Sequence, residues 1–146
     1  MLRDPALIPL SHQHHNGLAL GVLILRSVTA DSSPANIAIL AQKIIDRYEL
    51  ELMNHFEIEE QVLFPACGPS ALVDELIADH RALEALVARI RTEPSAPLLR
   101  QFCELLAAHI RREERELFEQ IQATLPREVL DRAGQEIDRR AVRVCL

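Results

Sequence analysis

The sequence predicts an all-α protein, an antiparallel up-down-up-down four-helix bundle followed by a short fifth C-terminal helix. No stretch alternates apolar and polar residues as a strand would, and no Asn-Gly or Asp-Gly pair marks a hairpin turn. Serines and prolines instead divide the chain into segments of helical length separated by short breaks. Long helices joined by short turns run antiparallel to their neighbours.

The helix boundaries follow from cap residues and prolines. We expect the first helix over residues 10–29. Ser33 before Pro34 is a cap followed by proline at the first helical position, which predicts a second helix over 34–65. Ser70 predicts a third helix over 70–91, and the break RTEPSAP precedes a fourth over 96–123. Pro126 begins a short fifth helix that ends at about residue 140.

Apolar spacing predicts which faces of the helices meet. The first helix carries Leu18, Val22 and Leu25 at spacings of four and three, and the last long helix has the same rhythm in its apolar positions, Leu106, Leu117 and Ile121. We expect these stripes to face a common axis and to form a mainly aliphatic core.

Composition limits the class of protein. A chain of 146 residues with 49% hydrophobic and 26% charged residues is typical of one globular domain, which we assign to residues 1–146. The net charge of −6 and the lack of a basic stripe argue against a nucleic-acid partner. The sequence has no uninterrupted run of about 18 apolar residues, so we expect no membrane span, and the N-terminus does not resemble a signal peptide.

The three cysteines are an odd number and form no CxxC pair, so we expect free thiols and a cytoplasmic location. Cys67 is the one that we regard as a candidate for reactivity. The sequence does not define the oligomeric state.

One pattern occurs twice. HFEIEEQVLF at residues 55–64 and HIRREERELF at 109–118 both read HxxxEExxLF. The helix before each copy contains a histidine three residues before a leucine, in HHNGL and DHRAL, which pairs His15 with His80. Two related helical hairpins that face one another would bring four histidines and two glutamates together.

Those residues have the chemistry of a metal site. Residues four apart lie on one face of a helix, so His55 with Glu59 and His109 with Glu113 each present two donors toward the core. Two carboxylates buried in an aliphatic core need bound cations to compensate their charge. Mixed nitrogen and oxygen donors suit iron, manganese or zinc, whereas calcium and magnesium prefer all-oxygen sites.

Six donor residues exceed the number that one structural zinc takes, so they predict two metals. Each metal would take two histidines, with both carboxylates bridging ions roughly 3.5–4 Å apart. With one bridging solvent oxygen, each ion would keep one open coordination position, as a reactive site does.

The neighbouring polar residues have simpler interpretations. We expect Glu60 and Glu114 to be solvated or to pair with an arginine, and we expect the arginines of the second copy to be solvated. Close to His15, His12 is expected to support the site or to add a ligand, whereas His14 is expected to point elsewhere.

On these residues the chain resembles the hemerythrin-like proteins, the family of HHE cation-binding domains, over roughly residues 8–123. The resemblance implies a four-helix bundle with two iron ions, Fe2+ or Fe3+, bridged by an oxo or hydroxo group. Manganese and zinc remain alternatives. The ligands carried over from the family motif are His15, His55, Glu59, His80, His109 and Glu113.

Two departures from the oxygen-carrying hemerythrins bear on function. Where those proteins have a fifth histidine, one turn after the third-helix ligand, this chain has Glu84. Glu113 also follows the last histidine by four residues, where the carriers have an aspartate at five. The pattern is closer to the four-histidine members linked to iron–sulfur cluster repair, nitric oxide or peroxide handling. Glu84 is either a surface acid or a further ligand.

We therefore expect a non-haem di-iron protein that binds or reacts with a small oxidant, namely dioxygen, nitric oxide or peroxide. If it is an enzyme, it is a di-iron oxidoreductase. Two alternatives remain open: an iron-holding or iron-sensing and redox-sensing module without turnover, and a metal-free helical interaction domain.

Overall fold

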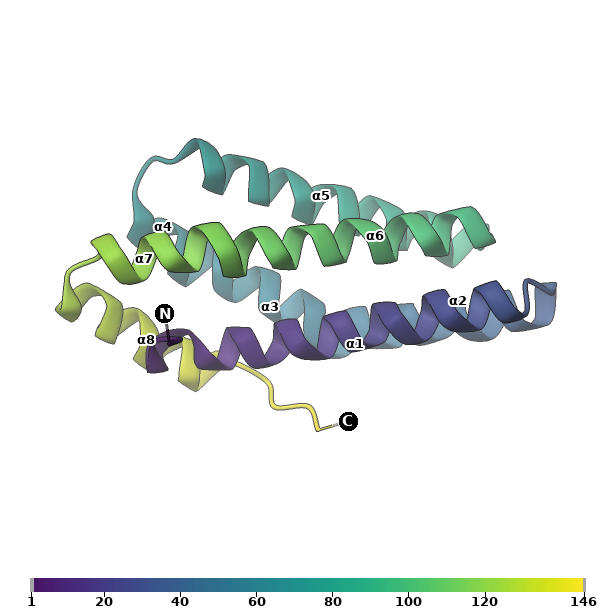
Figure 1. The fold of residues 1–146 in the computed structure, drawn as a ribbon, viewed down its shortest axis with the longest axis horizontal. Coiled ribbons are helices and arrows are strands. Elements are labelled where there is room, and N and C mark those ends of the chain that lie inside the picture. Colours follow the sequence, from purple (N-terminus) through teal and green to yellow (C-terminus); the bar gives the residue numbers. More distant parts are fainter. Residues whose placement is uncertain (1, 146) are drawn as a thin grey trace.

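The computed structural model describes residues 2–145 and confirms an all-α bundle (Figure 1), with no strand among these residues. A 3-10 turn, η1 (Pro5–Leu7), leads into α1 (Ile8–Ala30). The second long helix runs from α2 (Pro34–Arg47) to α4 (Phe64–Cys67), and the third is α5 (Ala71–Thr92). The fourth runs from α6 (Ala96–Arg112) to α7 (Phe118–Thr124), and α8 (Arg127–Arg140) follows. These bounds agree closely with the predicted segments.

Three serines begin the helices, as side-chain caps do. Ser33, Ser70 and Ser95 each accept a hydrogen bond from the backbone N–H three residues ahead. Gly68, with φ of 71°, ends α4 in a backbone conformation that favours glycine. The predicted breaks therefore coincide with local chemistry that stops and restarts the helix.

The second and fourth long helices are not uniform α-helices, although we expected them to be. The second contains two π-helical turns, η2 (Tyr48–Leu52) and η3 (Glu59–Leu63), on either side of α3 (Met53–Ile58). The fourth contains η4 (Glu113–Leu117) between α6 and α7. In both η3 and η4 the first residue is the glutamate of HxxxE, and its carbonyl accepts from the N–H of the phenylalanine five residues on. Wide turns of this kind are frequent at functional sites.

The predicted core face of α1 is confirmed only in part, because Leu18 and Leu25 are partly buried against the core while the fully buried positions lie one residue away. Val22 is 49% exposed, whereas Ile24 and Val28 are fully buried. The buried face also includes Gly17 and Gly21, and an added Cβ at Gly21 would lie 3.9 Å from Cys103 of α6. Because glycine has no side chain, these positions let α1 approach α6 closely. The predicted face was drawn from the spacing of apolar side chains, which leaves glycines out. The predicted stripe of the fourth helix, Leu106, Leu117 and Ile121, is buried as expected.

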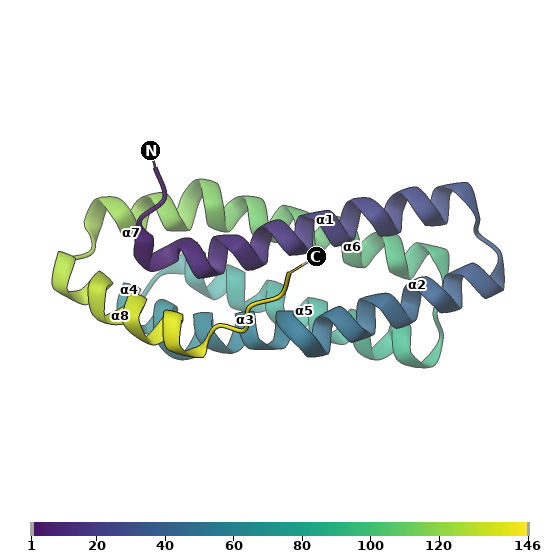
Figure 2. The ribbon, with the colours of Figure 1, turned by 90° about the horizontal axis from the view of Figure 1, so that it is seen from below.

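The core consists of two apolar clusters with a polar layer between them. One cluster includes Ile24, Leu83 and Leu106, and the other includes Leu10 and Leu117. The second cluster also takes in α8, which packs on η1 at one end of the bundle, and beyond α8 the chain turns back along α1 and α3 (Figure 2). None of the helices in the described part of the chain is long and apolar enough to cross a membrane.

Close packing of α8 on η1 gives a first prediction. A Cβ at Gly134 would lie 2.6 Å from Ala6 Cβ and 2.8 Å from Ala6 Cα, so Gly134→Ala must displace backbone. We expect it to lower the free energy of unfolding by about 1–3 kcal/mol in a denaturant titration. The matched control, Gly21→Ala, meets nothing closer than ordinary contact and should be neutral or stabilising by roughly 0.5–1 kcal/mol. Equal effects of the two substitutions would contradict this packing.

Candidate metal site

The polar layer contains six buried side chains, drawn from all four long helices. Two glutamates and one histidine have no exposed side-chain surface, and the other three histidines are at most 3% exposed. They form two groups of four whose possible ligand atoms all lie within 4.8 Å of one another. One group is His14, His55, Glu59 and Glu113, and the other is Glu59, His80, His109 and Glu113. Both carboxylates therefore belong to both groups.

The imidazoles present their Nε2 atoms to these carboxylates. His55 Nε2 lies 3.2 Å and His80 Nε2 lies 3.1 Å from the same oxygen, Glu59 Oε1. His109 Nε2 contacts Glu113 Oε1, and His14 Nε2 lies 3.8 Å from that atom.

Several of these converging atoms have no hydrogen-bond partner. They are Nε2 of His14, His55 and His109, Oε2 of Glu59 and both carboxylate oxygens of Glu113. Buried polar atoms without partners are costly, and a bound cation would satisfy this set of nitrogen and oxygen donors. The donor set therefore fits the cations that the sequence indicated.

The opposite ring nitrogen of every histidine is held by a hydrogen bond. The Nδ1 distances are 2.6 Å to Glu114 Oε2 for His14, 2.8 Å to Gln13 Oε1 for His55, 2.7 Å to Glu60 Oε2 for His80 and 3.0 Å to Asp79 Oδ2 for His109. An acceptor at Nδ1 keeps the proton there and leaves the Nε2 lone pair free. The four hydrogen bonds thus hold the rings with Nε2 toward the shared carboxylates, an orientation in which they could bind a metal.

These four hydrogen bonds repeat the internal symmetry of the sequence. The residue before each lone histidine, Gln13 or Asp79, supports the HxxxE histidine of its own half. The second glutamate of each HxxxEE, Glu60 or Glu114, instead supports the lone histidine of the other half. Glu114 also pairs with Arg3 and Glu60 with Arg81, which confirms the expectation that these glutamates pair with an arginine.

Burial and neighbouring charges act in opposite directions on the titration of the site. Burial lowers the pKa of His55, and it lowers that of His109 to about 4, although the Glu59 carboxylate opposes both shifts. For His80 burial also favours the neutral ring, but hydrogen bonds to Glu59 and Glu60 outweigh it and raise the pKa. Burial likewise opposes ionisation of Glu59, yet His55 and His80 lower its pKa.

His15 is the predicted site residue that the structure does not bring into the cluster. It is exposed, and the neighbouring His14 occupies the place that we assigned to it. Both this assignment and the predicted core face of α1 took Leu18 as a core position. The buried face of α1 lies one residue earlier, so a ligand aligned through Leu18 is also displaced by one residue. The other five predicted residues come together. Aligning Gln13-His14 with Asp79-His80, an acceptor followed by a histidine, would have identified His14.

Neither of the two uncertain residues reaches the cluster. His12 is exposed and its Nε2 lies 3.4 Å from the Val144 carbonyl oxygen. Glu84 belongs to neither group of possible ligands and pairs with Arg81, its Oε1 lying 2.9 Å from the Arg81 guanidinium.

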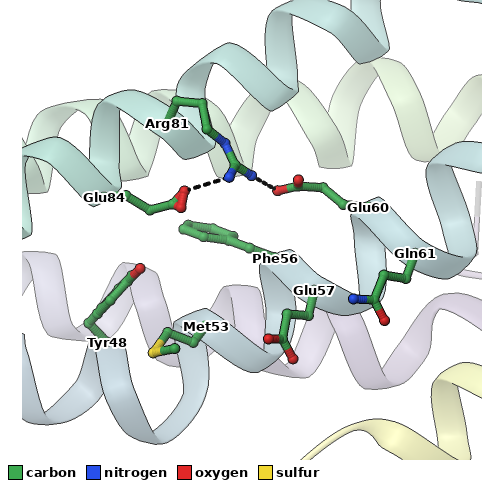
Figure 3. Close-up of a pocket in the computed structure, with 8 residues that line it drawn as sticks. All are labelled: Tyr48, Met53, Phe56, Glu57, Glu60, Gln61, Arg81 and Glu84. Carbon is green, nitrogen blue, oxygen red and sulfur yellow. Dashed lines mark hydrogen bonds and ion pairs between the residues drawn. The ribbon is translucent and has the colours of Figure 1, made fainter.

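Glu84 lines a surface pocket of about 430 Å³ beside the site (Figure 3). Arg81 spans the pocket from α5, between Glu84 and Glu60, and the ring of Phe56 lies beneath it. The pocket lies close to the clustered side chains, because Phe56, which lines it, stacks on His80 with ring centroids 4.0 Å apart. Phe56 and Glu60 therefore separate this pocket from His80.

Comparison with known proteins agrees with this geometry. A family model, the hemerythrin HHE cation-binding domain, matches residues 7–121. The chain belongs to this family. The match spans every residue of the two groups of possible ligands, whereas α8 and the chain that follows it lie beyond the match. No curated protein and no solved structure matches the chain significantly.

The placement of His14 gives a second prediction. We expect His14→Ala to lower the metal content after loading with ferrous iron, because one of the two groups loses a nitrogen donor. His15→Ala, which alters the adjacent exposed ring, should leave the metal content unchanged. Metal analysis of both desalted proteins measures this difference. The reverse result would restore the original assignment of His15.

The buried carboxylates give a third prediction. In metal-free protein, Glu113→Gln removes a buried charge, so we expect it to unfold at the same or a higher temperature than the wild type. Ferrous iron should stabilise the wild type, by about 2.7 kcal/mol at 100 times the dissociation constant, and stabilise Glu113→Gln much less. Anaerobic calorimetry with and without iron tests both effects.

Glu116→Gln, on the same helix with a side chain that is 54% exposed, is the matched control for Glu113→Gln. It should change neither the unfolding temperature nor the response to iron. A Glu113→Gln protein that gains as much stability from iron as the wild type would argue against this carboxylate as a donor.

Proposed function

We propose that the chain is a non-haem di-iron protein that binds or reacts with a small oxidant, namely dioxygen, nitric oxide or peroxide. The observation that carries the proposal is the sharing of both carboxylates by two groups of four donors. In this proposal His14 and His55 hold one iron, and His80 and His109 hold the other. Glu59 and Glu113 bridge the two ions.

The donors suit iron as the bound metal. Four imidazoles and two carboxylates are intermediate between the thiolate-rich and the all-oxygen sets, and such mixed sets suit iron, with manganese and zinc as the alternatives. The family is named for cation binding, which agrees with this choice.

Reactivity with a small molecule follows from the count of donors and from their burial. Two imidazoles, two carboxylate oxygens and a bridging oxygen leave one of six positions open on each ion. The bound iron pair would supply electrons for the oxidant. The protein buries the donors away from solvent, and the four Nδ1 hydrogen bonds would keep the rings in place when the charge at the centre changes.

An iron-holding or sensing role without turnover is the second candidate. The burial of all six donors favours it, because a reactant must pass side chains such as Phe56 to reach them. We place the protein in the cytoplasm in either case, since its three cysteines are free thiols. Burial raises the pKa of Cys67 to about 11, which disfavours the thiolate that a reactive cysteine needs.

Optical spectroscopy of the iron-loaded protein tests the proposal. We expect two irons per chain and an oxo-bridge absorption band that a reductant bleaches and oxygen restores. Repeated additions of peroxide then separate the candidates, because an enzyme consumes each addition whereas a holding or sensing module does not turn over.

Fewer than one iron per chain after anaerobic reconstitution, with no change in thermal stability, would contradict both candidates. The remaining alternative would then be a metal-free helical interaction domain.

A further inference from the structure

The chain beyond α8 is tied to the bundle by hydrogen bonds to side-chain amides of α1 and α3. Residues 142–145, which we call the C-terminal strap, have no regular secondary structure and run along α1 and α3 (Figure 2). Val142 N–H donates to Asn54 Oδ1 at 3.0 Å, and Val142 O accepts from Gln13 Nε2 at 3.3 Å. Farther along, Val144 O accepts from Asn16 Nδ2 at 3.1 Å. The strap therefore covers a row of polar side chains on one side of the metal site.

Gln13 connects the strap to a metal-binding histidine. Its Oε1 accepts from His55 Nδ1, and its Nε2 donates both to Asn54 Oδ1 at 3.0 Å and to Val142 O. Gln13 is 1% exposed, so its amide is enclosed by these partners. Asn54 is itself oriented by the chain end, because its Nδ2 donates to Arg140 O and its Oδ1 accepts from Val142 N–H.

An amide, unlike a carboxylate, supports the ring in only one of its two orientations. If the Gln13 amide turned over, its NH₂ group would face His55 Nδ1 and favour a proton on Nε2, the atom that faces the cluster. The two acceptors on its far side oppose this turn, since a reversed amide would place an oxygen against two other oxygens. One of those acceptors belongs to the strap.

The other half of the molecule shows what the strap replaces. There the equivalent position is Asp79, whose carboxylate supports His109. Either oxygen of a carboxylate can accept a hydrogen bond, so Asp79 needs no partner to choose its orientation. Its side chain is 20% exposed, and its Oδ2 lies 3.8 Å from the Arg112 guanidinium. Among the described residues, the hydrogen bonds of the strap reach the side chains of Gln13, Asn16 and Asn54, on the side of the amide.

We propose that the C-terminal strap is a positioning element for the metal centre, which holds the Gln13 amide in the orientation that keeps His55 Nε2 free for metal. This inference rests on the proposed function, because His55 matters to the strap as a ligand. It assigns a role to residues that lie outside the matched hemerythrin domain.

The test compares three chains of different length and composition. A stop codon after Ala141 removes the strap but keeps this buried residue, whose N–H donates to Ile137 O at the end of α8. A stop codon after Val144 is the matched control, since it keeps every contact described above. The third chain combines the stop after Ala141 with Gln13→Glu, which imitates Asp79 and offers His55 an oxygen in either orientation.

Two measurements are made on each chain after circular dichroism has shown that it is folded. The first is the position of the His55 ring proton in metal-free protein, from the nitrogen NMR signals of the imidazole. The second is the transfer of bound iron to a ferrous chelator. Without the strap we expect the proton to leave Nδ1 and iron to be held roughly 10- to 100-fold more weakly, the range for losing a partner of a ligating histidine. Gln13→Glu should reverse both changes.

If the chain ending at Ala141 does not fold, Asn54→Ala in the full chain removes the other acceptor of Gln13 and an anchor of the strap, and the same shifts are expected. An unchanged His55 signal, equal effects of both stop codons, or no rescue by Gln13→Glu would each overturn the strap's role. The proposed function fails separately, if the wild-type chain holds no iron. A displaced ring proton on removing the strap would then show that the strap orients the His55 ring, while its role toward a metal would be overturned.

Discussion

The rest of this structure depends on the placement of two carboxylates with no solvent exposure, Glu59 and Glu113, in the middle of an aliphatic bundle. Such groups destabilise a core unless opposite charge or hydrogen bonds surround them. Four imidazoles surround this pair, and each imidazole has its own hydrogen-bond acceptor farther out. Two apolar clusters then close the polar layer from both ends of the bundle. The rings direct free Nε2 lone pairs at the carboxylates, and both oxygens of Glu113 have no hydrogen-bond partner, so the negative charge of the pair is left for bound cations to compensate.

The wide turns η3 and η4 show how the backbone accommodates these carboxylates. Each turn begins at the buried glutamate and ends where the phenylalanine N–H donates back to the glutamate carbonyl. The glutamate can then face the polar layer while Phe64 and Phe118 pack into the apolar cluster next to it. The repeated LF at the end of HxxxEExxLF is therefore explained by the same backbone feature in both halves.

Local patterns in the sequence predicted most of the fold and five of the six clustered side chains. Helix caps and prolines determine the boundaries, and an i, i+4 pair stays on one face whatever surrounds it. The register of α1 was missed because apolar spacing gives no weight to Gly17 and Gly21, which pack against α6. The pairing of Gln13-His14 with Asp79-His80 was the signal in the sequence that would have selected His14 over His15. The π-turns and the role of the strap arise from contacts between distant segments, which no local pattern records.

The two halves of the site differ in one respect that the shared pattern conceals. His80 and His109 both donate to carboxylates, whereas on the other side only His14 does, because His55 donates to the neutral amide of Gln13. An imidazole that donates to a carboxylate is the more basic ligand. Two ions bound here would therefore experience unequal donors despite the pseudo-twofold frame. The repeated motif thus matches the donor atoms of the two halves but not their basicity, and His55 is the one ring of the four supported by a neutral partner.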